Sequence, residues 1–382
     1  MKNLGLYIHI PFCKKKCNYC DFYSCTNVDN IKRYIKSICK QLTIEAPLYK
    51  DYTFDTIFIG GGTPSLIDGE VFKLLADAIK DNFSLKEGFE FSIEANPGTI
   101  TKEKLVAYKE SGVNRISIGL QSTFDNELAT LGRIHNYDTF VKNYSMAREC
   151  GFGNINIDIM YALPEQNKGR FLETLKRVIE LNPEHISAYS LKIEDNTPFG
   201  KIKSSLALPD EDEEYDTYLS MCEILSKNSY LQYEISNFSK KGYECKHNLK
   251  YWQSEEYIGI GPSAHSFFNG ERYSYISNVD EYILELEEEI LPIKLLEESD
   301  KNEHASPKIS KIDEYVMLKM RLASGVDSKE FKAIFGVEFI EAYPQIKIYL
   351  NTGHVIFENG AYKFTPKGFF VSNYILTEIL SF

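Results

Sequence analysis

Residues 9–22 read HIPFCKKKCNYCDF and place Cys13, Cys17 and Cys20 within eight residues of one another. Structural zinc sites are closed by four protein ligands, commonly in two C-x2-C arms far apart, and this chain has no second arm. Iron–sulfur clusters are commonly held by four cysteine thiolates, so three thiolates would leave one iron open to a non-protein ligand. The spacing therefore favours an iron–sulfur cluster with an open iron, with a zinc site or a chance clustering of cysteines as the alternatives.

Strand-like and helix-like segments alternate through the first 240 residues on either side of this stretch. This alternation predicts right-handed βαβ crossovers and an α/β fold with a parallel sheet, either doubly wound or arranged as a barrel. Polar residues and glycines follow three strands, in GGGTP (60–64), EANPG (94–98) and LQST (120–123), at the edge where parallel sheets bind ligands. The predicted strands are residues 6–10, 55–61, 89–96, 115–121, 154–163 and 185–193, and helices are predicted at 70–83, 102–112 and 169–182.

The pattern changes after about residue 238, where residues 244–267 are rich in aromatic side chains and glycine. Helical stretches at 313–325 and 327–336 precede a hairpin at 354–365, in which Asn359 and Gly360 suit a two-residue turn. A terminal amphipathic helix at 368–380 completes a small winged-helix-like α+β domain. No basic stripe follows residue 313, so a structural or docking role is favoured over DNA binding. We predict segments 1–238, 239–300 and 301–382, with a polar linker at 295–311.

Composition limits the classes of partner and the cellular compartments that we expect for this protein. The 382 residues carry 55 acidic against 43 basic side chains and a net charge of −12, which disfavours nucleic-acid binding. No uninterrupted apolar run of about 18 residues and no signal peptide is evident, so we expect no membrane span and a cytoplasmic location. Eight cysteines are too sparse for a disulfide scaffold.

The three-cysteine stretch resembles the radical S-adenosyl-L-methionine (SAM) superfamily. More narrowly, seven motifs in the expected order between residues 4 and about 270 resemble the oxygen-independent coproporphyrinogen III dehydrogenases and their heme-chaperone relatives: YIHIPFC, GGGTPS, RISIGLQS, LGRIH, IDIMYALP, YEISNF and HNLKYW. The resemblance implies a partial (β/α)6 TIM-like barrel with a [4Fe–4S] cluster on Cys13, Cys17 and Cys20, and SAM on its open iron. It also implies an electron donor such as flavodoxin or ferredoxin, whose electron leads to cleavage of SAM into methionine and a 5′-deoxyadenosyl radical.

The resemblance maps further residues onto SAM. Gly60, Gly61, Gly62 and Thr63 would let the backbone approach its amino and carboxylate ends. Glu94 could accept from an ammonium or a ribose hydroxyl, Arg133 suits a carboxylate, and Asp158 suits ribose hydroxyls. Gln121 is mapped to the same site, and Tyr7 corresponds to an aromatic contact, with strand packing as its alternative. Phe12, Tyr19 and Phe22 flank the cysteines and would shield such a cluster, with plain core packing as the alternative.

Two subgroups share this core. The dehydrogenases carry a further cysteine where this chain has Phe22, and a longer segment before the cluster motif than the twelve residues found here. The heme-chaperone subgroup instead has C-D-F and H-N-x-x-Y-W, and both occur in this chain. The resemblance thus implies a protein that binds heme through His247, with Tyr251 and Trp252 as flat apolar faces and Cys245 as a second possible ligand. Delivery of heme to an unidentified acceptor is the favoured function, and oxidative decarboxylation of coproporphyrinogen III in porphyrin biosynthesis is the alternative.

Overall fold

A computed structural model describes residues 1–292, 294–296 and 310–380. The chain forms two compact units, one comprising Met1–Pro209 and Glu256–Glu297 and the other Asp210–Glu255 and Glu298–Phe382. The predicted segment boundaries at residues 238 and 300 stay a prediction. Most of the predicted linker, residues 297–309, lies outside the described residues.

The first unit is built on a parallel sheet whose strands carry the six predicted segments. Neighbouring strands pair in parallel from β1 to β6, and β1 also pairs in parallel with β9. Among the described strands β1 and β6 are not paired with each other, so the barrel is partial. The strands are β1 (Lys2–Ile10), β2 (Tyr52–Gly61), β3 (Leu85–Ala95), β4 (Arg115–Gln121), β5 (Ile155–Tyr161), β6 (His185–Ser190) and β9 (Tyr257–Ile260).

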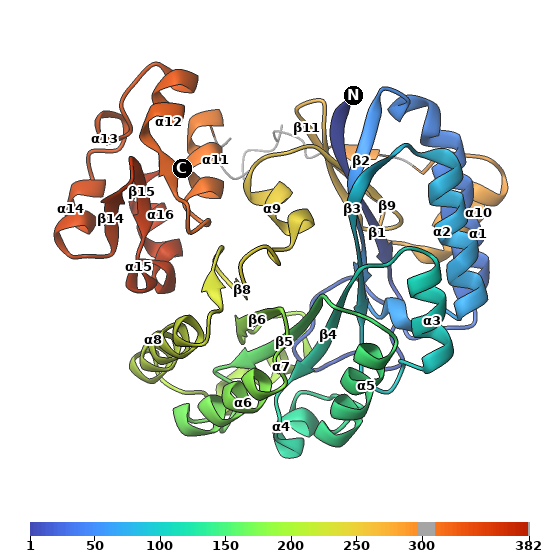
Figure 1. The fold of residues 1–382 in the computed structure, drawn as a ribbon, viewed down its shortest axis with the longest axis horizontal. Coiled ribbons are helices and arrows are strands. Elements are labelled where there is room, and N and C mark those ends of the chain that lie inside the picture. The colour runs from blue at the N-terminus through green and yellow to red at the C-terminus, as the bar shows by residue number, and fades with distance from the viewer. Residues whose placement is uncertain (293, 297–309, 381–382) are drawn as a thin grey trace. The chain divides into compact units, whose positions relative to one another are not determined.

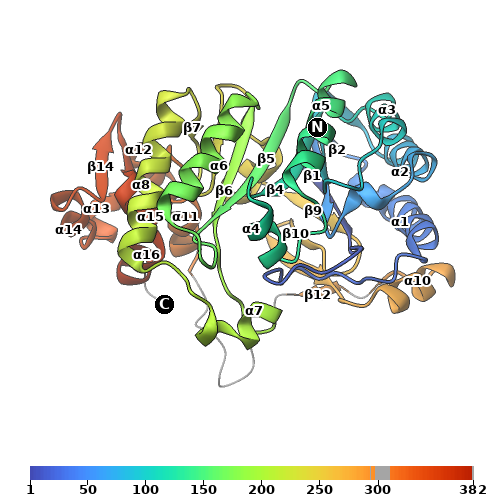
Figure 2. The same cartoon turned by 90° about the horizontal axis from the view of Figure 1, so that it is seen from below.

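Burial explains why these segments form central strands. All seven residues of β4 are buried, and β1 and β2 are buried along most of their length, as expected for a sheet covered on both faces. Figure 1 shows α1, α2 and α3 side by side along the outer face of β1–β3, and Figure 2 shows α6 beside β5. The covering helices are α1 (Ile31–Glu45), α2 (Gly69–Asn82), α3 (Lys102–Glu110), α5 (Tyr137–Glu149) and α6 (Lys168–Glu180). The predicted α/β fold with parallel crossovers is confirmed.

The chain returns to this unit after residue 255, which periodicity along the sequence did not predict. Strand β9 adds to the free side of β1, and antiparallel strands β10 (His265–Phe268), β11 (Glu271–Tyr275) and β12 (Lys294–Leu296) continue the sheet. Helix α10 (Val279–Glu287) packs on α1, and Arg33 forms an ion pair with Glu287. Strands β9 to β12, which begin in the later part of the aromatic and glycine-rich segment, therefore cover one edge of the parallel sheet.

The second unit contains α8 (Glu211–Lys227), the short strands β7 (Leu231–Gln232) and β8 (Asn237–Ser239), and α9 (Lys246–Trp252). Helices α11 (Lys311–Lys319) and α12 (Ser328–Phe335) precede the predicted hairpin of β14 (Val355–Glu358) and β15 (Ala361–Phe364), and β13 (Val326–Asp327) pairs with β15. Asn359 and Gly360 have φ angles of 53° and 82°, as the predicted turn requires.

The end of the second unit differs from the expectation in one respect. The predicted final helix is two helices, α15 (Pro366–Phe370) and α16 (Ser372–Ile379), because Val371 leaves helical geometry at φ −102° and ψ 21°. The small α+β domain is confirmed. No described helix is long and apolar enough to cross a bilayer.

Candidate functional site

The three cysteines lie on the loop that follows β1, and main-chain hydrogen bonds fix its path. The Cys25 N–H donates to the Pro11 carbonyl at 2.7 Å, and the Cys13 N–H donates to the Cys25 carbonyl at 2.9 Å. The side-chain amide of Asn18, between the second and third cysteines, donates to the Thr130 carbonyl at 2.8 Å. The loop is therefore fastened at its base and at its tip.

A chain of polar contacts joins two of the thiols. The Arg133 guanidinium donates to Cys17 Sγ at 3.5 Å and also to Asn96 Oδ1. The Asn96 amide donates to Thr63 Oγ1 at 2.9 Å, and the Thr63 hydroxyl donates to Cys13 Sγ at 3.5 Å. Burial opposes the charge of Arg133, but Tyr19 and Cys17 outweigh it and hold the guanidinium pKa above its usual value. The sulfurs thus receive hydrogen bonds from donors that are themselves held in place, which suits anionic thiolates.

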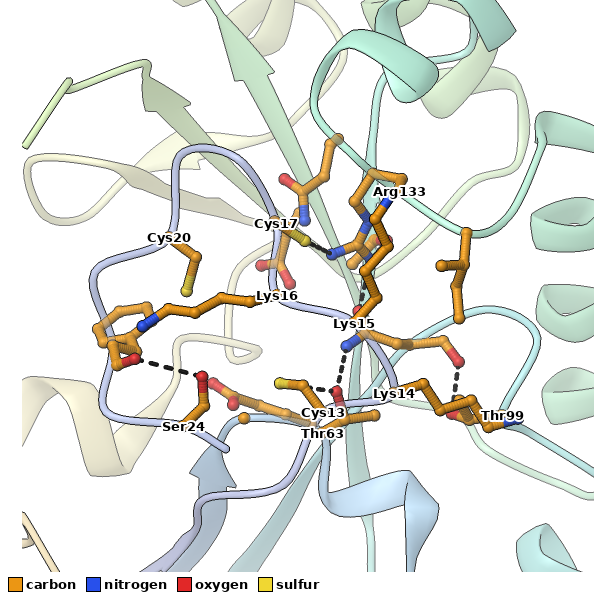
Figure 3. A pocket seen from close by; sticks show the side chains of 18 of the residues that line it. Cys13, Lys14, Lys15, Lys16, Cys17, Cys20, Ser24, Thr63, Thr99 and Arg133 are labelled. Carbon is orange, nitrogen blue, oxygen red and sulfur yellow. Dashed lines mark hydrogen bonds between the residues drawn. The ribbon is translucent and has the colours of Figure 1, made fainter. Parts of the chain in front are cut away.

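These side chains surround a cavity of about 360 Å³ at the carboxyl ends of the parallel strands (Figure 3). Its wall contains ten residues predicted for the cluster and for SAM: Cys13, Cys17, Cys20, Gly61, Gly62, Thr63, Glu94, Gln121, Arg133 and Asp158. The structure therefore brings together, from strands β2 to β5 and from loops beside them, residues separated by up to 145 positions in the sequence.

Two glycines at the carboxyl end of β2, its last residue Gly61 and the following Gly62, allow β1 and the cluster loop to approach. A Cβ on Gly62 would lie 2.8 Å from the Phe12 carbonyl oxygen and 2.9 Å from that of Ile10. Gly61 has φ +115°, and its Cβ would lie 2.6 Å from the His9 ring. Both positions accept only a hydrogen without rearrangement of their neighbours. The GGGT motif therefore sets the distance between two strand ends.

Two half-buried carboxylates face the cavity in different surroundings. Burial, and secondarily the charge of Asp158, raises the Glu94 pKa to about 7, although the Gly61 N–H donates to Glu94 Oε2 at 2.9 Å. Burial also raises the Asp158 pKa, while the Ser117 hydroxyl at 3.0 Å and the Asn156 amide at 2.7 Å donate to the carboxylate and oppose the shift. A ligand carrying positive charge or hydroxyl donors would satisfy both groups.

Several predicted residues lie elsewhere or in unexpected settings. Tyr7 and Gly60 are absent from the cavity wall, and the Tyr7 hydroxyl is hydrogen-bonded to His9 Nδ1 at 2.9 Å. Gln121 adopts a left-handed φ of 73° at the β4 end, beside a register shift, and this turns the chain at the cavity edge. Phe22 is 70% exposed, so the expected shielding by this ring is not seen, whereas Phe12 is fully buried.

Asn96, Ser117 and Gly119 also line the cavity but were not singled out from the sequence. Asn96 lies in the EANPG stretch after β3, whose polar character signalled a ligand edge without identifying the residue. Ser117 and Gly119 lie inside β4, where strand alternation alone marks them only as buried. One cavity therefore holds most of the residues predicted for the cluster and SAM, and its wall also contains polar positions that the sequence did not indicate.

His247, Tyr251 and Trp252 lie on α9 in the second unit. His247 is fully buried, its Nε2 is hydrogen-bonded to the Tyr251 hydroxyl at 2.9 Å, and the two rings meet edge-to-face. Lys250 is 3% exposed and pairs with Glu255 at 2.8 Å. In this conformation both side chains are bonded to neighbouring residues, His247 to Tyr251 and Lys250 to Glu255.

A buried carboxylate that was not predicted from the sequence, Glu234, contacts Trp252 of α9. Glu234 is 1% exposed, and burial raises its pKa to about 7, opposed by the Ser236 N–H and by the side chains of Asn237 and Trp252. The Ser236 N–H donates to Glu234 Oε1 at 3.1 Å. The only tryptophan of the chain is thus tied to a titratable group of the same unit.

Comparison with known proteins places this geometry in a family. Residues 7–178 match the radical SAM superfamily and residues 307–371 match the HemN C-terminal domain. Heme chaperone HemW from Haemophilus influenzae is 35% identical over 99% of this chain and 98% of its own length. The chain belongs to the heme chaperone HemW family. Heme chaperone HemW from Escherichia coli is 41% identical over 69% of each chain.

A solved structure supports the fold. The coproporphyrinogen III oxidase HemN from Escherichia coli superimposes with a TM-score of 0.83 at 22% identity, covering 100% of this chain and 90% of the other. Membership of the superfamily implies a [4Fe–4S] cluster and SAM. The residues fit them, because three thiols, two with side-chain donors, share one cavity with two carboxylates and a guanidinium. Within the described residues no three His, Cys, Asp or Glu side chains already stand in metal-binding geometry.

Proposed function

We propose that this protein is a heme chaperone that binds heme together with a SAM-ligated [4Fe–4S] cluster and delivers heme to acceptor proteins. The observation that carries the proposal is the similarity to heme chaperone HemW along practically the whole chain. The likeness to HemN supports the fold alone at its 22% identity and does not favour the oxidase activity.

The cluster would be held by Cys13, Cys17 and Cys20, and with SAM it would supply one-electron chemistry at the cavity. Thr63 and Arg133 would orient two thiolates, and Glu94 and Asp158 would receive the ammonium and hydroxyl donors of SAM. Electron supply by a flavodoxin or ferredoxin is part of this proposal, as is a cytoplasmic location, because an oxygen-labile cluster and eight free thiols suit a reducing compartment.

Heme would be taken up at α9, with His247 as the iron ligand. Ligation through Nε2 would exchange its 2.9 Å hydrogen bond to Tyr251 for a bond to iron, and the buried ring would have to become accessible. A carrier needs such a reversible contact, since a ligand that returns to an internal partner can release its cargo. Trp252 and Tyr251 would then supply aromatic faces for the porphyrin.

The test is an anaerobic heme titration of reconstituted protein, followed by the Soret band. His247→Ala should shift the band or weaken binding by about tenfold, or about 1.4 kcal/mol, and His354→Ala in the same unit should leave it unchanged. Iron and sulfide content should be the same in all variants. A wild-type protein that binds no heme, yet converts coproporphyrinogen III with consumption of SAM, would overturn the proposal in favour of the dehydrogenase.

A further inference from the structure

Three consecutive lysines, Lys14, Lys15 and Lys16, lie on the cluster loop between the first two cysteines. All three are exposed, and all three line the mouth of the cavity (Figure 3). In the part of the chain that the structure describes, no carboxylate forms an ion pair with any of them. Positive charge is thus concentrated at the redox site of a chain whose net charge is −12.

Apolar side chains are exposed around the same opening. Phe22 is 70% exposed, Ile134 53% and Tyr189 40%, and each lines the cavity. Burying any of these three side chains against a partner would remove apolar surface from water, which favours binding. A cationic ring with apolar side chains beside it suits a short-lived encounter between proteins, in which charge steers and a small apolar contact orients.

We propose that Lys14, Lys15 and Lys16, with Phe22, form the docking surface for the acidic face of a small one-electron carrier protein. The proposal rests on the proposed function in one respect, the presence of the cluster on this loop. With a flavodoxin as the carrier, the flavin hydroquinone anion gives up one electron and becomes the neutral semiquinone, and no proton is gained or lost in this step. The oxidised cluster gains that electron, and no bond between heavy atoms forms or breaks.

Position and charge argue for a carrier rather than another occupant. The lysines share their loop and the cavity wall with the cysteines, so a protein docked on them would lie close to the sulfurs. A carrier with the opposite sign of charge is attracted here, while the net charge of the chain, −12, opposes its approach as a whole. Such steering accelerates association by roughly ten- to a thousandfold at low ionic strength.

The experiment uses cluster-reconstituted full-length protein and fully reduced flavodoxin, mixed anaerobically in a stopped-flow instrument. Replacing Lys14, Lys15 and Lys16 with Glu should lower the second-order rate of cluster reduction by about tenfold or more in low salt, and weaken flavodoxin binding in calorimetry similarly. The triple Gln variant should show a smaller loss. High salt should slow the wild type and close the gap.

A matched control carries the same charge change at the other end of the sheet. Lys2, Lys50 and Lys86 are exposed at the amino ends of β1, β2 and β3, away from the cavity edge. Their triple Glu variant should react with flavodoxin at the wild-type rate. Phe22→Ser should weaken binding to a degree that does not depend on salt.

Reduction by photoreduced 5-deazariboflavin, a small neutral reductant, separates the outcomes. If this reductant reduces every variant equally and flavodoxin does so too, the docking surface is wrong and the cluster assignment stands. The docking surface is also wrong if the Glu variant loses heme binding but keeps its flavodoxin rate, because the lysines would then serve the tetrapyrrole propionates. If the wild type assembles no cluster on this loop, both proposals fail.

Discussion

Arg133 links three parts of the site that the sequence places far apart. Its guanidinium contacts Cys17 and Asn96, and Asn96 continues through Thr63 to Cys13. Cys20 receives no such contact from these side chains. The two supported thiols are therefore oriented before any cluster binds, which lowers the cost of assembling it.

At the same scale, we expect serine in place of Cys13, Cys17 or Cys20 to abolish the cluster, because three thiolates are the only protein ligands proposed for it. Iron and sulfide analysis after anaerobic reconstitution measures the effect. Cys25→Ser is the control, since Cys25 is five residues from Cys20 but does not line the cavity. About four irons per chain in any of the first three variants would show the assignment to be mistaken.

The loops after β1 and β2 behave as one element, because glycine lets their backbones touch. We predict that Gly62→Ala lowers the free energy of unfolding by about 1–3 kcal/mol and reduces cluster content, since the new methyl meets two main-chain oxygens. Gly153→Ala is the matched control, because nothing lies within 4 Å of a Cβ there and its φ is not left-handed. Urea unfolding and iron analysis test both. Equal stability of the two variants would contradict the close approach.

Helix α9 is joined to the β7–β8 segment by the contact of Trp252 with Glu234. Because burial sets the Glu234 pKa near 7, the carboxyl is protonated below that pH and ionised above it. Its folded pKa exceeds the unfolded value of about 4.3, so the stability it contributes is complete below about pH 4 and is lost as pH rises to about 7.

The single tryptophan makes this titration observable. We expect Trp252 fluorescence to change with a midpoint near pH 7, and the transition to vanish in Glu234→Gln. Glu211→Gln, an exposed carboxylate on α8, should leave it intact. A transition that survives Glu234→Gln would assign the midpoint to another group.

Across the whole molecule, local sequence patterns predicted the strands and turns well, but they did not predict which distant segments pair. The six strands, their parallel arrangement and the hairpin at Asn359 follow from the hydrophobic period and from turn chemistry, which act over a few residues. The partnership of β1 with β9 joins residues about 250 positions apart, and no local signal encodes it. For the same reason the cavity could be located at the strand ends from the sequence, whereas the place of Asn96 in its wall and the exposure of Phe22 are seen only in the structure.

This pairing predicts how shortened chains behave. A fragment of residues 1–238 leaves the β1 edge open and removes the fully buried Ile258 and Ile260, so we expect it to aggregate or to hold no cluster. A fragment of residues 1–297, which keeps β9 to β12, should retain more of the fold. Circular dichroism and iron content of the soluble fractions compare the two. A well-folded 1–238 fragment with a full cluster would refute the role assigned to β9.

The distance between β1 and β9 along the chain also sets an order of events during synthesis. The first strand leaves the ribosome early, but its partner at residues 257–260 follows only after about 250 more residues, roughly ten to fifty seconds later at ordinary translation rates. Throughout that interval the cluster loop is already made while one side of its supporting strand has no neighbour. Iron delivered to a nascent chain would therefore meet an unfinished site, so maturation is expected to follow release from the ribosome.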